Sequence, residues 1–110
     1  MTNCDCACQR FLPHTDGFAG PVSACGFTES GRLVTIFIYL NDVGHGGATR
    51  FNQLGIEIEP RRGMAVIHFP ATCGLELDEL TEHEGSSAVE EKWLLTTWIW
   101  RDMRNDERYT

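Results

Sequence analysis

Basic residues and long hydrophobic stretches are both scarce in this sequence. The 110 residues include 9 lysines and arginines against 16 aspartates and glutamates, for a formal net charge of −7. A chain this acidic repels phosphate backbones, and Arg61–Arg62 is the only adjacent basic pair, so we expect no nucleic-acid partner. No run of about 18 apolar residues occurs, and we therefore expect no membrane span.

The first residues lack the basic and apolar regions of a secretory signal peptide. This absence predicts a cytoplasmic (cytosolic) protein, or a chain that starts inside a longer gene product. A truncated start would leave the endoplasmic reticulum open as an alternative compartment.

The five cysteines make an odd count, which argues against a disulfide scaffold. Cys25 and Cys73 are isolated, and we expect mostly reduced thiols. Cys4, Cys6 and Cys8 form C-x-C-x-C, which lacks the two-to-four-residue gap of zinc-binding pairs. We therefore favour a short, flexible, cysteine-rich N-terminal segment over residues 1–10 rather than a metal clip.

Short β-rich runs separated by glycine and proline predict a single all-β domain, a sandwich or barrel. The core is expected over residues 11–103, with a tail over 104–110. Helical periodicity is poor, and only Leu75–Leu80 suits a turn of helix. The predicted strands are Leu33–Leu40, Ala48–Phe51, Ile56–Ile58, Met64–Phe69 and Lys92–Arg101.

Two metal-binding side chains stand one residue apart in the segment HTDGF. If His14 and Asp16 lie in a strand, they point to the same face and suit two corners of a metal site. Taken alone, the other histidines have simpler interpretations. His45 suits an exposed turn, His68 the core or rim of a strand, and His83 the surface.

Lys92 is the only lysine, and it opens an otherwise apolar strand. Strand alternation places it on one face with Leu94, Thr96, Trp98 and Trp100. Such a lysine either extends to solvent at the strand end or meets a buried anion. A carboxylate co-substrate held inside a barrel fits the second alternative.

Four motifs lie between Phe11 and Arg101. The first is a set of spaced residues: His14-x-Asp16, then His83 and, nine residues after it, Lys92. The other three are continuous segments: RLVTIFIYLNDVGHGGATRF, the segment from Ile58-Glu59-Pro60 to Phe69, and KWLLTTWIW. Together they resemble the iron(II)/2-oxoglutarate dioxygenases of the prolyl 4-hydroxylase type. The corresponding family patterns are R-x-x-T-x-x-x-Y-L-N-D-V-x-x-G-G-x-T-x-F, P-x-x-G-x-A-x-x-F and K-W-x-x-x-x-W-I.

The resemblance implies a double-stranded β-helix, or jelly roll, that binds Fe(II) through His14, Asp16 and His83. It implies that 2-oxoglutarate and O2 are consumed to hydroxylate an unactivated C–H bond, releasing succinate and CO2, with ascorbate as reductant. Lys92 would pair with the distal carboxylate of 2-oxoglutarate. Thr49, Trp98 and Tyr39 would complete that pocket, although each also suits an ordinary core position.

For the substrate, the resemblance implies a prolyl residue in a peptide or protein, with a small molecule as the alternative. Arg32 matches a family arginine and is a candidate for substrate contact, or else a solvated charge at a strand end. Trp100 stands where many peptide-hydroxylating members have a histidine, and we include it among the candidate substrate residues.

The N-terminal part departs from the family pattern. The family's Y-x-x-G-x-x-Y segment is represented by Asp5, Cys8 and Phe11, which removes an expected hydrogen-bonding tyrosine. Only 13 residues precede His14, where the family has helices and at least one more strand. The chain is then a compact variant, a fragment or a protein with a misassigned start. The competing function is a catalytically inactive jelly-roll binding module.

Overall fold

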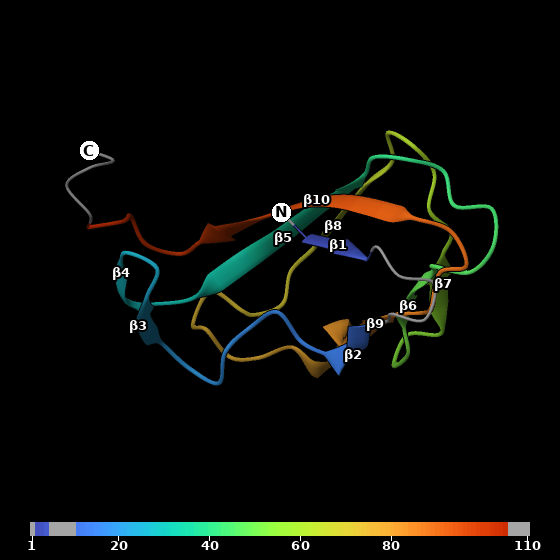
Figure 1. The fold of residues 1–110 in the computed structure, drawn as a ribbon. Helices are drawn as coiled ribbons and strands as arrows, with labels where there is room; N and C mark the ends of the chain where they lie inside the picture. The colour runs from blue at the N-terminus through green and yellow to red at the C-terminus, as the bar shows by residue number, and fades with distance from the viewer. Residues whose placement is uncertain (1, 5–10, 106–110) are drawn as a thin grey trace.

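The computed structural model describes residues 2–4 and 11–105 and shows two four-stranded antiparallel sheets that face each other (Figure 1). The large sheet has the order β1 (Thr2–Cys4), β10 (Lys92–Trp100), β5 (Arg32–Tyr39) and β8 (Ala65–His68). The small sheet has the order β2 (Phe11–His14), β9 (His83–Gly85), β6 (Thr49–Phe51) and β7 (Ile56–Ile58). The hairpin of β3 (Val22–Ala24) and β4 (Phe27–Ser30) lies apart from the small sheet, at the other end of the molecule in Figure 1. The predicted all-β jelly roll is confirmed.

The five predicted strands correspond to β5, β6, β7, β8 and β10, with every end within one residue of its expected position. The strands β3, β4 and β9 were not predicted, and β1 lies in the segment that was expected to be flexible. In place of a helical turn over Leu75–Leu80, a short 3₁₀ helix, η1, spans Glu79–Thr81. Asp78 caps it by accepting a hydrogen bond from the Leu80 amide.

Part of the segment expected to be flexible is paired in the large sheet. Thr2–Cys4 lies antiparallel to residues 92–94 of β10. Cys6 and Cys8 lie outside the described residues, as does most of the expected tail, while Cys25 and Cys73 are exposed free cysteines. Within residues 2–4 and 11–105, no helix is long and apolar enough to cross a membrane.

Strand β5 supplies much of the core, because its alternate side chains point between the two sheets. Thr35, Phe37 and Tyr39 are buried, as the period of two in a strand requires. The Tyr39 hydroxyl shares a buried 2.8 Å hydrogen bond with the Thr49 hydroxyl on β6. This bond ties the large sheet to the small one.

Strand β10 pairs with β5 along most of its length, from Leu94 opposite Tyr39 to Trp100 opposite Arg32. The register shifts between Ile99 and Trp100. Beyond the shift, the Trp100 ring stacks on Phe27 of the β3–β4 hairpin, with ring centroids 4.3 Å apart and an angle of 3°. This contact ties the hairpin to the end of the large sheet.

We predict that Leu75→Ala destabilises the protein far more than Leu80→Ala. Leu75 is 2% exposed and packs against Gly31, whereas Leu80 is 53% exposed. The buried change should lower the free energy of unfolding by about 2–5 kcal/mol and the exposed one by about 0.5 kcal/mol or less. Urea unfolding followed by tryptophan fluorescence measures both. Equal losses would contradict the assigned burial.

Candidate metal centre

A cavity of about 270 Å³ lies between the two sheets. This volume lies near the lower end of ordinary ligand sites, which suits a small ligand. The predicted residues Lys92, Thr49, Trp98 and Arg32 all line it. The other lining residues are Phe11, His14, Thr15, Asp16, Thr35, Phe37, His83, Gly85, Leu94 and Thr96.

Strand pairing brings His14 and His83 together, although 69 positions separate them in the sequence. They are opposite partners in the β2–β9 pair, and their ring centroids are 4.5 Å apart. Asp16 reaches them in a way that the alternation of a strand did not predict. Strand β2 ends at His14, and Asp16 lies in the bend that follows. The expectation that both residues share one strand is therefore wrong, and the bend turns the carboxylate back toward the imidazoles.

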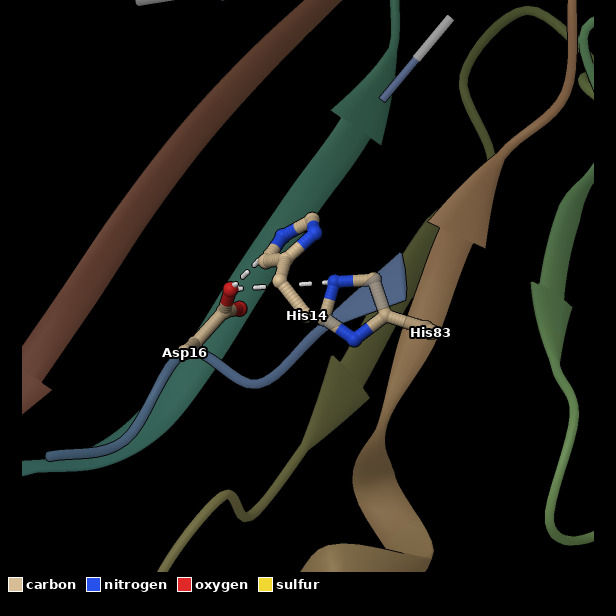
Figure 2. A group of neighbouring side chains, drawn as sticks. All are labelled: His14, Asp16 and His83. Atoms are coloured by element: carbon tan, nitrogen blue, oxygen red, sulfur yellow. Dashed lines mark ion pairs between the residues drawn. The ribbon is translucent and has the colours of Figure 1, made fainter. Parts of the chain in front are cut away.

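The three side chains converge on one point (Figure 2). Asp16 Oδ1 lies 3.4 Å from His14 Nε2 and 3.7 Å from His83 Nε2. The three ligand atoms all lie within 4.8 Å of one another. The side chains of Asp16 and His83 are 10% exposed and that of His14 is 44% exposed, so the centre opens toward solvent on the His14 side.

Each histidine is oriented by a carbonyl two residues before it. His14 Nδ1 is 2.7 Å from the Leu12 oxygen, and His83 Nδ1 is 2.8 Å from the Thr81 oxygen. A carbonyl only accepts, so each Nδ1 must carry the proton and donate. Nε2 of each ring then lies near Asp16 Oδ1 and is the nitrogen left to bind a metal, as in metal-binding histidines whose other nitrogen is held by a carbonyl.

The ionisable groups of the metal centre shift one another's pKa values. Burial by itself would raise the pKa of Asp16, but the neighbouring His14, His68, His83 and Thr35 together outweigh it and hold that pKa well below the usual value. The hydrogen bond to Asp16 raises the pKa of His14. Burial lowers the pKa of His83. Asp16 is therefore a carboxylate at neutral pH.

Two residues beside Asp16 were not identified from the sequence. Thr35 Oγ1 donates to Asp16 Oδ2 at 2.8 Å, and His68 Nε2 lies 3.4 Å from the same oxygen. Thr35 occupies the threonine position of R-x-x-T, a signal that was available. The aromatic position of P-x-x-G-x-A-x-x-F falls on His68 rather than on Phe69, because it is eight residues after Pro60. His68 is thus a departure from that pattern at the centre itself.

A cation lies in the same cavity as the three converging side chains. Lys92 is 2% exposed, and its Nζ donates to the Gly47 oxygen at 2.6 Å and lies 5.7 Å from the centre of the Tyr39 ring. Thr49 lines the cavity beside it, whereas Tyr39 lies behind Thr49 and bonds to it. Burial raises the pKa of Tyr39, which therefore stays a neutral hydroxyl.

The two candidate substrate residues have different positions. The Arg32 guanidinium lies 3.8 Å from the centre of the Trp98 ring, and both residues line the cavity. Arg32 Nε and Trp98 Nε1 are buried donors with no hydrogen-bond partner in the described part of the chain. The centre of the Trp100 ring lies 6.0 Å from the Arg32 guanidinium carbon, and the ring stacks on Phe27. Trp100 does not line the cavity.

The donor set suits an Fe(II) ion. Two imidazole nitrogens and one carboxylate oxygen converge, and no thiol lines the cavity among the described residues. Such a set occupies one face of a metal and leaves other positions for small ligands. Backbone carbonyls hold the Nδ1 atoms of both rings, which leaves their Nε2 atoms to a metal.

Comparison with known proteins gives a consistent result. A family model described as "2OG-Fe(II) oxygenase superfamily" matches residues 2–100. The chain is 33% identical over 94 residues to human prolyl 4-hydroxylase subunit alpha-1, a match that covers 82% of this chain and 17% of that subunit. It is 28% identical over 113 residues to probable prolyl 4-hydroxylase 10 of Arabidopsis thaliana, covering 83% of this chain and 38% of that protein.

Among solved structures, the chain is similar to the viral collagen prolyl hydroxylase of Paramecium Bursaria Chlorella virus-1 in complex with 2OG. The TM-score is 0.74 and the identity 26%, over 87% of this chain and 54% of that one. The chain therefore spans between about a sixth and about half of the length of these relatives.

We predict that His83→Ala abolishes tight Fe(II) binding. The change removes one of three ligands and leaves two, which hold a metal poorly. Anaerobic titration with Fe(II) by calorimetry measures the loss. His45→Ala is the matched control, because His45 is exposed and pairs with Glu90 away from the centre. Unchanged affinity in His83→Ala would contradict the assigned ligand set.

Proposed function

The chain belongs to the 2OG-Fe(II) oxygenase superfamily, and from this we propose that it forms the core of a dioxygenase that hydroxylates a prolyl residue of a peptide or protein. The proposal covers activity, co-substrate and substrate together, since the relatives are longer proteins.

One observation carries the proposal: a three-ligand centre and a buried lysine share a single small cavity. His14, Asp16 and His83 supply the donors, and Lys92 supplies a positive charge from the opposite sheet. A 2-oxo dicarboxylic acid has a chelating group at one end and a carboxylate at the other. The cavity therefore matches both ends of such a co-substrate.

The bound iron would supply the oxygen chemistry, in which one oxygen atom of O2 enters the substrate C–H bond and the other enters succinate as CO2 is released. The residues of the chain bind and orient. Lys92 would pair with the distal carboxylate of 2-oxoglutarate, and the Thr49 hydroxyl, held by Tyr39, would donate to the same group. Leu94 and Phe37 line the wall and exclude water.

The same cavity offers a place for the substrate. Arg32 Nε and Trp98 Nε1 are buried donors without an acceptor among the described residues, and leaving such donors unpaired is unfavourable. A backbone carbonyl of a bound peptide would satisfy them. The names of the relatives, which include prolyl 4-hydroxylases and a collagen prolyl hydroxylase, support a prolyl residue next to that carbonyl.

The test of the proposed function is an anaerobic titration with Fe(II) and then 2-oxoglutarate, followed by addition of O2 and proline-containing peptides. A visible charge-transfer band, then one added oxygen atom per peptide with a matching amount of succinate, is the expected result. The same peptides with alanine in place of proline are the control. A folded sample that shows no band would favour the inactive binding module.

We predict that Lys92→Met weakens 2-oxoglutarate binding while Fe(II) binding persists. Methionine keeps much of the buried volume and removes the charge. Loss of one partner of a buried charge pair costs about 2–5 kcal/mol, roughly thirty-fold or more in Kd. The intensity of the charge-transfer band against 2-oxoglutarate concentration measures it. Arg50→Met is the control, because Arg50 pairs with Glu57 outside the cavity. An unchanged Kd in Lys92→Met would show that the carboxylate binds elsewhere.

A further inference from the structure

The two oxygens of the Asp16 carboxylate face different groups. Oδ1 faces the Nε2 atoms of His14 and His83. Oδ2 faces away from them, toward Thr35 and His68 of the large sheet. We infer that Thr35 and His68 together hold Oδ2, so that Asp16 presents Oδ1 alone to the metal. This inference rests on the proposed function, because it concerns the iron site proposed above.

Strand register places the two holding groups side by side. Thr35 on β5 and His68 on β8 are direct partners in the antiparallel pair. Directly opposite side chains in such a pair lie on the same face, so both point between the sheets. Thr35 is 1% exposed and His68 is 8% exposed. Both therefore reach Asp16 in an environment from which water is largely excluded.

His68 is a buried imidazole whose Nε2 lies near the Asp16 carboxylate. Its ring lies among the rings of Phe37, Phe51 and His83, with centroids 4.9–6.3 Å away. Neither ring nitrogen has a hydrogen bond of regular geometry within the described residues. Asp16 Oδ2 lies 3.4 Å from His68 Nε2. A buried imidazole that served only to pack would be better replaced by an aromatic hydrocarbon ring.

His68 is not a fourth ligand. The group of ligand atoms that lie within 4.8 Å of one another contains His14, Asp16 and His83 only. His68 acts through Asp16 and is therefore a positioning residue. A carboxylate held at one oxygen binds a metal through the other, which keeps the remaining metal positions open for the co-substrate.

The test compares variants that change the hydrogen bond with a variant that changes only packing. His68→Phe keeps a ring and removes the donor, and His68→Gln restores an N–H at a similar distance from the backbone. Thr35→Val removes the other donor at nearly constant volume. Leu75→Ala is the control for lost stability alone, because Leu75 is 2% exposed and does not line the cavity.

The measurement is the affinity for Mn(II), an air-stable ion that prefers the same oxygen and nitrogen ligands, by electron paramagnetic resonance of the unbound ion. We expect His68→Phe and Thr35→Val each to weaken binding by about 10–100-fold, as for other residues that hold a metal ligand. His68→Gln should recover most of the loss. Leu75→Ala should lower the melting temperature with little change in affinity.

The outcomes separate this inference from the proposed function. A wild-type chain that fails to bind Mn(II) would overturn both. A wild-type chain that binds, with a folded His68→Phe of equal affinity or a His68→Gln no better than His68→Phe, would overturn the role of His68 alone. If His68→Phe does not fold, unchanged affinity in Thr35→Val would overturn the claim that Oδ2 must be held.

Discussion

The carboxylate of Asp16 is the group on which the rest of the centre depends. Removing a carboxylate from water is costly unless its oxygens receive compensating partners. Here the partners come from β2, β5, β8 and β9, and each of these strands contributes one side chain within 3.7 Å. The two sheets must therefore be correctly assembled before Asp16 can be buried as an anion.

The hydrophobic core is small, and its residues also support the site. Six hydrophobic residues are buried in the described part of the chain. Two of them, Phe37 and Phe51, contact the rings of the site histidines, and a third, Tyr39, holds Thr49 at the Lys92 end of the cavity. Core side chains thus also orient the functional groups. A large change in these positions would reduce stability and ligand binding together.

The cavity is arranged by charge as well as by shape. The ligand centre needs a divalent cation beside Asp16, and Lys92 is a cation buried at another part of the cavity wall. An anionic ligand with two acidic ends would be attracted to both places, in a chain whose formal net charge is −7. The buried donors on Arg32 and Trp98 lie on a further part of the wall. The metal ligands, the lysine and the unpaired donors therefore occupy three different parts of one small cavity.

The sequence determined five of the strands and the faces of β10, because alternation is a local property of the chain. It placed β5 and β10 within one residue and put Lys92, Leu94, Thr96 and Trp98 on the face that lines the cavity. With the motif resemblance, it also indicated the ligand set. Only the tertiary structure decided how the ligands meet, since that depends on pairing between distant segments. The bend after β2 turns Asp16 inward, and the β5–β8 register sets His68 beside Thr35. No spacing within one segment encodes these contacts, because they arise where two strands from different parts of the chain become neighbours.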